Sequence, residues 1–171
     1  MSRIAGSQRA VAYRDYRRRF VPVVTTVIAC LLGLFPLVVT TPLVPDFGFL
    51  VLITWRLLRP EIWMPATALW LGLFDDLISA HPLGQSMALW TLTFLLFDLI
   101  ESRVDYKDFW FDWLFAGCAI ILHTAGAWYI ALLMQSPTPF SLMLPQIGLS
   151  ILAYPVAARI VLGLDRWRLA R

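Results

Sequence analysis

Charged residues are scarce in this chain. Asp, Glu, Lys and Arg make up 15% of its 171 residues, whereas they make up about 25% of an average soluble domain. Hydrophobic residues account for 60%, and they lie in long uncharged runs that would aggregate in water. The composition therefore excludes a disordered chain and a water-soluble enzyme, and it indicates an integral membrane protein.

Cysteine and histidine are also rare. Cys30 and Cys118 lie in apolar runs without CxxC spacing, which excludes a disulfide-stapled fold and is typical of small core residues. Neither His81 nor His123 has a second histidine or a carboxylate three or four residues further on. We expect no metal site, because zinc needs three or four convergent ligands. No P-loop, GxSxG or GxGxxG motif is present, so we expect neither a cofactor nor catalysis.

Prolines, charges and turn residues divide the apolar sequence into six candidate membrane spans. The second span, of about 12 residues, covers only ~18 Å of a ~30 Å hydrocarbon core, so we expect a short or locally thinned element. No charge occurs from Trp113 to Ala158, and prolines at 137 and 139 supply the break between the last two spans. The predicted fold is all-α, a compact bundle of six transmembrane helices at about 20–44, 47–58, 62–79, 85–102, 113–134 and 142–163, with basic tails at 1–19 and 164–171.

The basic residues support six spans. With the amino terminus in the cytoplasm, all 14 Lys and Arg residues fall on the cytoplasmic side. If 47–58 did not span, only about six of them would remain there. We therefore expect both termini to be cytoplasmic, with the amino-terminal arginines contacting anionic phospholipids. Nucleic-acid binding is not expected, because a net charge of +3 beside a membrane has this simpler explanation.

Asp75 and Asp76 lie in the outer half of the third span, where the predicted topology places no Lys or Arg. Carboxylates at membrane depth are costly and usually have a reason to be there. Three interpretations stay open: a wet outer boundary near the amino end of the fourth helix, whose free amides favour negative charge; an interface with a basic partner; or a proton or cation relay. His123, the other ionisable group at depth, is expected to be isolated.

Arg56 and Arg59 end the second span on the inner side, and Pro60 forces the chain out of the helix there. These arginines either reach lipid phosphates or contact a carboxylate of a partner or of this chain. At the inner end of the fourth span, Asp98 and Glu101 are expected to form an interfacial ion cluster with Arg103 and Lys107.

Three short motifs resemble the MreD family of rod shape-determining proteins. They are Trp-Arg-Leu-Leu-Arg-Pro at 55–60, Gly-Leu-Phe-Asp-Asp at 72–76 and Pro-Leu-Gly at 82–84, while Ala80 departs from the glycine expected there. The resemblance implies structural or partner-interface roles for Arg56, Arg59, Pro60, Gly72, Asp75, Asp76, Leu83 and Gly84.

The same resemblance implies a non-enzymatic subunit in the inner membrane of a bacterium. Members of this family associate with the bitopic protein MreC and, through it, with the actin-like MreB, the glycosyltransferase RodA and a class B penicillin-binding protein. Their architecture is similar to the substrate-binding subunits of energy-coupling-factor vitamin transporters. The alternative function is therefore a small-molecule-binding, vitamin-like membrane subunit of a transporter, with a pocket that opens outward.

Overall fold

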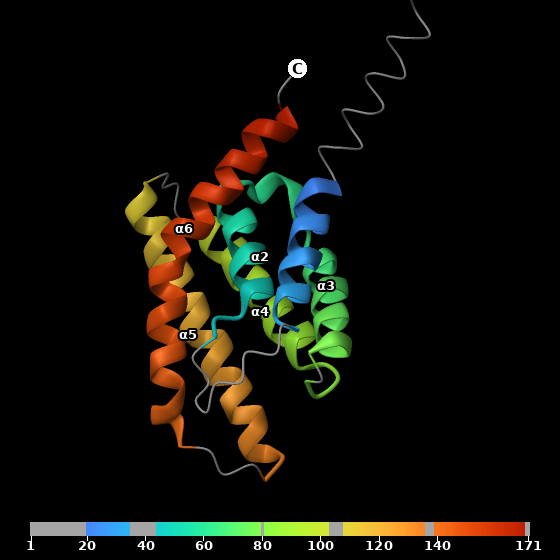
Figure 1. Cartoon of the computed structure of the whole chain (residues 1–171), viewed down its shortest axis with the longest axis vertical. Helices are drawn as coiled ribbons and strands as arrows, with labels where there is room; N and C mark the ends of the chain where they lie inside the picture. The colour runs from blue at the N-terminus through green and yellow to red at the C-terminus, as the bar shows by residue number, and fades with distance from the viewer. Residues whose placement is uncertain (1–19, 35–43, 80, 103–107, 136–138, 170–171) are drawn as a thin grey trace, which may run out of the picture.

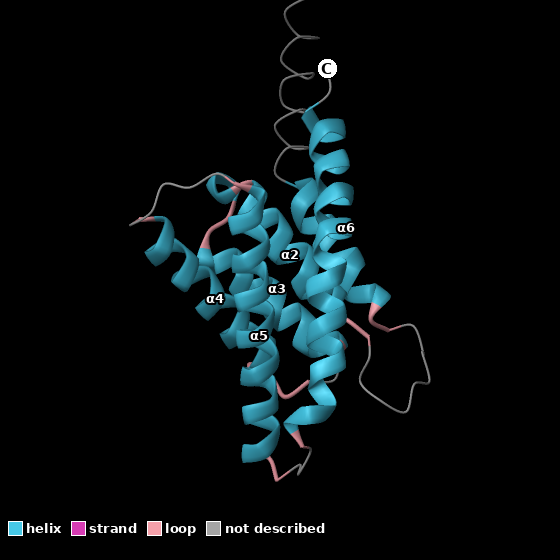
Figure 2. Cartoon of the chain, turned by 90° about the vertical axis from the view of Figure 1, so that its left-hand side faces the viewer, coloured by secondary structure: helices cyan, strands magenta, loops and turns pink. Residues whose placement is uncertain are grey.

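A computed structural model of the chain describes residues 20–34, 44–79, 81–102, 108–135 and 139–169 (Figure 1). The described residues form helices joined by turns and contain no strand (Figure 2). This confirms the all-helical prediction. The helices are Phe20–Leu32, α2 (Phe47–Leu58), α3 (Pro65–Ile78), α4 (Gln85–Glu101), α5 (Phe109–Leu133) and α6 (Leu144–Leu169), with short 3-10 helices at Pro60–Ile62 and Phe140–Met143.

Two of these helical segments are long and apolar enough to cross a membrane, namely Phe109–Leu133 and Phe140–Leu169. The helices α2, α3 and α4 have 12, 14 and 17 residues, which is shorter than the ~20 residues of a typical span. The six-span arrangement therefore stays a prediction.

Local sequence sets the helix boundaries. α2 begins after Asp46, whose Oδ1 accepts a hydrogen bond from the Phe49 amide at 3.0 Å, and it covers the predicted residues 47–58. The first described helix ends at Leu32, with a turn from the Gly33 amide to the Cys30 carbonyl at 3.0 Å. The rest of the predicted first span lies mostly in residues 35–43, outside the described part, so its end stays a prediction. α6 contains Pro155 and continues to Leu169, so it includes most of the expected carboxy-terminal tail.

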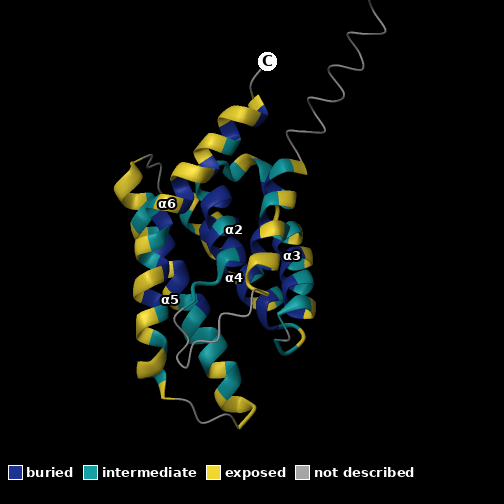
Figure 3. Cartoon of the chain, viewed as in Figure 1, coloured by how far each residue is buried: buried dark blue, intermediate teal, exposed yellow. Residues whose placement is uncertain are grey.

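The short helix α2 lies in the middle of the bundle, with α5 and α6 on one side and the first helix on the other (Figures 1 and 3). Eight of its 12 residues are buried, among them Leu52, Ile53 and Trp55, each 0% exposed. The Trp55 indole donates a hydrogen bond to Thr25 Oγ1 of the first helix at 2.9 Å. A helix surrounded by protein need not match the thickness of a bilayer. The central position of α2 is therefore compatible with its length of only 12 residues.

The outer faces of the surrounding helices are apolar. Trp70 of α3 is 67% exposed, whereas Trp90 of α4 is 0% exposed, so only the second of these two tryptophans belongs to the core. Other exposed apolar side chains lie on α4, α5 and α6, for example Leu99, Leu114 and Leu152. Surfaces of this composition suit lipid or a neighbouring membrane helix.

Candidate functional site

Asp76 forms the amino-terminal cap of α4. Its Oδ1 accepts a hydrogen bond from the Ser86 amide at 2.7 Å, and its Oδ2 accepts hydrogen bonds from the amides of Gly84 at 2.9 Å and Met87 at 3.3 Å. The residue is 1% exposed, so the free N–H groups at the start of the helix replace water around the carboxylate. The interpretation that placed this charge at the amino end of the fourth helix agrees with the structure, although the carboxylate is buried rather than hydrated.

Gly72 makes this cap possible. A Cβ atom at position 72 would lie 2.6 Å from Met87 Cα and 2.7 Å from Met87 N, so a glycine lets the two helices approach this closely. Asp76 follows one turn later on the same face of α3, beneath the first turn of α4. Gly84 precedes that turn with a φ of 97°, a conformation that glycine adopts readily. Gly72, Asp76 and Gly84 therefore act as one structural unit.

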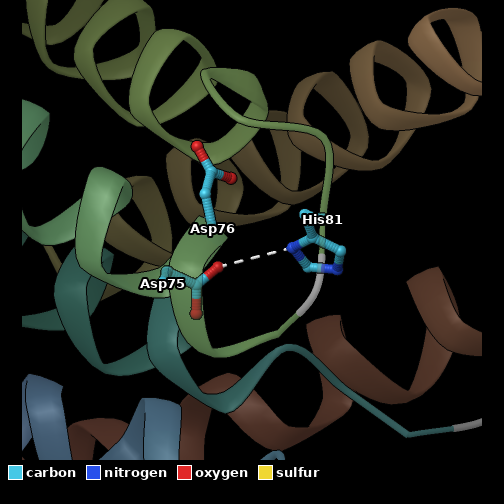
Figure 4. A group of neighbouring side chains, drawn as sticks. All are labelled: Asp75, Asp76 and His81. Carbon is cyan, nitrogen blue, oxygen red and sulfur yellow. Dashed lines mark ion pairs between the residues drawn. The ribbon is translucent and has the colours of Figure 1, made fainter.

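Asp75 faces a different set of groups. Its Oδ2 accepts a hydrogen bond from the Ser86 hydroxyl at 2.9 Å, and its Oδ1 accepts one from the Ser79 hydroxyl at 3.3 Å. His81 Nδ1 lies 3.6 Å from Asp75 Oδ2 (Figure 4). This carboxylate raises the pKa of His81 above its usual value, with smaller contributions from Asp46 and Asp76, while burial acts in the opposite direction.

Asp75, Asp76 and His81 bring possible ligand atoms within 4.8 Å of one another. The sequence did not predict this, because the carboxylates precede the histidine by five and six residues across a turn. In Figure 4, however, Asp76 points toward the start of α4 and away from the other two side chains. Both of its oxygens already accept hydrogen bonds from amides. The group therefore offers an imidazole and one carboxylate, fewer than the three or four ligands of a zinc site.

Two residues of the predicted motifs stand apart from this cluster. Leu83 lies in the turn between α3 and α4 with 73% of its surface exposed, so its side chain adds little to the packing of the hairpin. Ala80, the departure from the family pattern, lies outside the described residues.

Arg56 is buried between the ends of α2 and α4. Its Nη1 and Nη2 donate hydrogen bonds to the two oxygens of Glu101, each at 2.9 Å, and its Nη2 also contacts Asp98 Oδ1 at 2.5 Å. The arginine side chain is 1% exposed, while the two acids are 36% and 45% exposed. Arg56 thus contacts carboxylates of this chain, one of the two alternatives left open by the sequence. Arg103 and Lys107, expected in the same cluster, lie outside the described residues.

Arg59 joins the end of α2 to the end of α6. Its Nε and Nη2 donate hydrogen bonds to Asp165 Oδ2 at 3.1 and 2.8 Å. Arg168 Nε contacts the other oxygen of Asp165 at 2.6 Å, and its guanidinium lies 5.1 Å from the ring centroid of Trp55. Pro60 starts the short helix Pro60–Ile62 directly after this contact, so the proline ends α2 where Arg59 meets its partner.

His123 of α5 is not isolated, contrary to expectation. Its Nε2 lies 3.1 Å from Asp46 Oδ2, and its ring stacks on Phe49 with the centroids 4.2 Å apart. Burial alone would raise the pKa of Asp46, but the hydrogen bonds with His123 and the Phe49 amide outweigh it and lower the pKa. His123 thereby ties α5 to the start of α2.

A cavity of about 900 Å³ opens at the end of the molecule that holds Asp46 and the α3–α4 turn. It lies between the first helix, the start of α2, the α3–α4 turn, α5 and α6, and both histidine–carboxylate pairs are part of its lining. From the sequence we expected a pocket that opens outward only under the transporter alternative, and we predicted neither the residues that line this cavity nor the role of Asp165. Asp165 precedes Arg168 by three residues, a helical spacing that would have indicated a helix extending beyond residue 163.

The family model of the rod shape-determining protein MreD matches residues 14–164 of the 171-residue chain. The chain belongs to the MreD family. Membership of the MreD family implies a role in determining rod shape, and together with the two long apolar helices it indicates a membrane protein. No curated protein and no solved structure shows significant similarity to the chain. The expected likeness to transporter subunits is therefore still a prediction.

Proposed function

We propose that this protein is a non-enzymatic scaffold and regulatory subunit of the machinery that elongates rod-shaped bacterial cells. In this role it binds an MreC-like bitopic protein in the plane of the inner membrane and helps to organise lateral peptidoglycan synthesis. Through that partner it meets MreB, RodA and a class B penicillin-binding protein. The match of the MreD family to residues 14–164 carries the proposal.

The distribution of charge supports a multi-pass topology with both termini in the cytoplasm. Arg56 and Arg59 lie at the end of α2, where Arg59 meets Asp165 near the end of α6. At the opposite end lie Asp46 and the α3–α4 turn, with no Lys or Arg among the residues described there. Arginines gathered on one side of a membrane protein favour the cytoplasm for that side.

The apolar outer faces support a partner that binds within the membrane. A bitopic protein would present one spanning helix, and such helices associate by packing against a complementary helix face. The described surface offers separate faces on α3, α5 and α6, marked by Trp70, Leu114 and Leu152, which are 67%, 61% and 67% exposed. The ion pair between Arg59 and Asp165 would hold the α6 face in a fixed position relative to α2.

The first test is to tag the carboxy terminus, extract the full chain in mild detergent and identify the co-purifying proteins by mass spectrometry. Recovery of an MreC-like protein with wall-synthesis enzymes is expected. Recovery of a transport ATPase pair with a coupling membrane protein would contradict the proposal and favour the transporter alternative.

The second test locates the interface. Leu152→Ala, Leu114→Ala and Trp70→Ala each shorten one exposed side chain on a different helix. We expect one of these changes to lower partner recovery by about tenfold or less while the other two leave it unchanged. Thermal unfolding of each variant serves as the control, since loss of the fold would lower recovery for a different reason. Unchanged recovery in all three would contradict binding through these faces.

A second candidate function is small-molecule binding as a subunit of a transporter. The cavity of about 900 Å³ favours it, because cavities of roughly 300–1,000 Å³ are typical of ligand sites. A ligand retained through purification, identified by mass spectrometry of the denatured protein, would support this function.

A further inference from the structure

The cavity between the first helix, α2, α3, α5 and α6 has a marked charge asymmetry. Asp46 and Asp75 are part of its lining, and Lys and Arg are missing from the described residues that surround it. Both carboxylates lie at one end of a protein whose described arginines lie near its other end or along its outside. Because the surrounding protein is less polar than water, the field of these two charges is weakly screened inside the cavity.

The hydrogen-bond donors of Asp75 leave its charge in place whenever His81 is neutral. Asp75 is 2% exposed. It accepts hydrogen bonds from the hydroxyls of Ser79 and Ser86, and the thiol of Cys30 on the first helix also contacts it. His81 lies at the longer distance of 3.6 Å, with 39% of its side chain exposed. An imidazole cancels the charge of a carboxylate only while it is protonated.

His123 provides a second, independent observation. It is 7% exposed and part of the same lining. Its Nε2 contacts Asp46, while Nδ1 has no hydrogen-bond partner among the described residues. Buried polar atoms without a partner are rare and call for an explanation such as an absent ligand.

The remaining lining is mostly apolar and partly aromatic. Phe47, Ala127 and Trp128 contribute to it from α2 and α5. Aromatic faces attract ammonium groups as well as apolar surface. A ligand that fits would therefore combine an apolar body with a positive charge.

We propose that this cavity binds a small organic cation, with its ammonium group beside Asp75 and its apolar body against α5. A bare metal ion fits less well, because Asp76 is committed to the amides of α4. Binding of the cation does not depend on the protein partner, so experiments can contradict this proposal while the proposed scaffold function stands, and the reverse.

Affinity for the cation will depend on pH. Protonated His81 competes with the ligand for Asp75, while Asp46 and Asp76 also face this imidazole from α2 and α3. His123, on α5, faces the other carboxylate. Affinity is therefore expected to rise as pH increases and His81 loses its proton.

The test uses three ligands of the same shape. The full chain in lipid nanodiscs is titrated calorimetrically with tryptamine, tryptophol and indole-3-acetate, which carry a positive, a neutral and a negative group on the same indole. Empty nanodiscs correct for partition into lipid. Tryptamine is expected to bind about tenfold more tightly than tryptophol, and indole-3-acetate more weakly still. Equal affinities, or no tryptamine binding above the empty-nanodisc level, overturn the proposal.

Two variants assign the effect to Asp75. Asp75→Asn should bring the affinity for tryptamine to within about twofold of that for tryptophol, and His81→Gln should remove most of its pH dependence. Asp108→Asn is the matched control, because it also removes one negative charge but lies before α5, away from the cavity lining. Thermal unfolding shows whether each variant is folded. A cation preference that survives Asp75→Asn in a folded protein overturns the proposed position of the ammonium group.

Discussion

At the scale of single residues, the closeness of α3 and α4 explains why a glycine and an aspartate stand four positions apart. Gly72 removes the side chain that would separate the two backbones, and Asp76 then reaches the amides that begin α4. A buried carboxylate with three amide donors needs no basic partner.

Gly72→Ala is predicted to destabilise the fold by about 1–3 kcal/mol, because the new methyl group would overlap the backbone of Met87 and Ser86, which cannot rotate away. The free energy of unfolding in detergent measures this effect. Gly148→Ala in α6 is the matched control, since a Cβ atom at that position meets nothing within 4 Å. The control should be neutral or stabilising by less than about 1 kcal/mol. Equal effects in the two variants would contradict the role given to Gly72.

His81 is predicted to make stability depend on pH. Its pKa in the folded protein lies above the unfolded value of 6.5, mainly because of Asp75. A raised pKa means that the contribution to stability is complete below about pH 6.5 and is lost as pH rises through the folded value. Unfolding midpoints of the native protein and His81→Gln, measured from about pH 5.5 to about pH 9, should converge at the alkaline end. A constant difference across this range would contradict the ion pair.

At the scale of elements, the end of α2 is fixed by two arginines that serve different helices. Arg56 meets the end of α4, and Arg59 meets the end of α6. The Arg59 contact spans 106 residues in sequence and the Arg56 contacts span 42 and 45, although the two arginines are only three positions apart. The short central helix is thereby tied to two of the outer helices.

The buried Arg56 is predicted to need only one of its two acids. Asp98→Asn or Glu101→Gln alone should cost about 1 kcal/mol, since the other carboxylate still faces the guanidinium. Both changes together should cost about 3–5 kcal/mol, because a charge that is 1% exposed then has neither carboxylate. The free energies of unfolding of the native protein, the two single variants and the double variant form a double-mutant cycle. Glu61→Gln is the control, because that acid is 63% exposed. If the cost of the double variant equals the sum of the two single costs, Arg56 does not share its two acids in this way.

The sequence predicted the elements better than the contacts between them. Prolines, Asp46 and Gly84 mark helix boundaries by local chemistry, so α2 and the start of α4 were predicted within a residue. The partners of Arg59 and His123 lie 106 and 77 residues away in sequence. Such pairings depend on how the helices pack, which a hydropathy pattern does not contain. The predicted end of the first span, near residue 44, follows residues 35–43, which lie outside the described part, so it stays a prediction.

At the scale of the whole molecule, the described charges divide between two ends. Carboxylates and histidines surround the cavity at one end, while the arginine contacts of α2 and α6 occupy the other. This division predicts which end faces each side of the membrane.

The topology is tested by cysteine labelling. Leu83 and Glu61 are 73% and 63% exposed, at opposite ends of the bundle. In a Cys118→Ser background, with the buried Cys30 retained, Leu83→Cys should react with a membrane-impermeant maleimide in intact spheroplasts. Glu61→Cys should react only after the membrane is permeabilised. Labelling of both positions, or of Glu61→Cys alone, in intact spheroplasts would contradict the proposed orientation.

The cap that Asp76 forms on α4 also sets an order for biogenesis. Its amide partners follow it by eight to eleven residues, so they leave the ribosome after α3 is complete. Until then the carboxylate lacks these donors, and transfer of α3 into lipid is costly. Once the first turn of α4 emerges, the carboxylate and the amides shield one another from hydrocarbon. We therefore expect α3 and α4 to enter the bilayer together, as a preformed hairpin rather than as two successive helices.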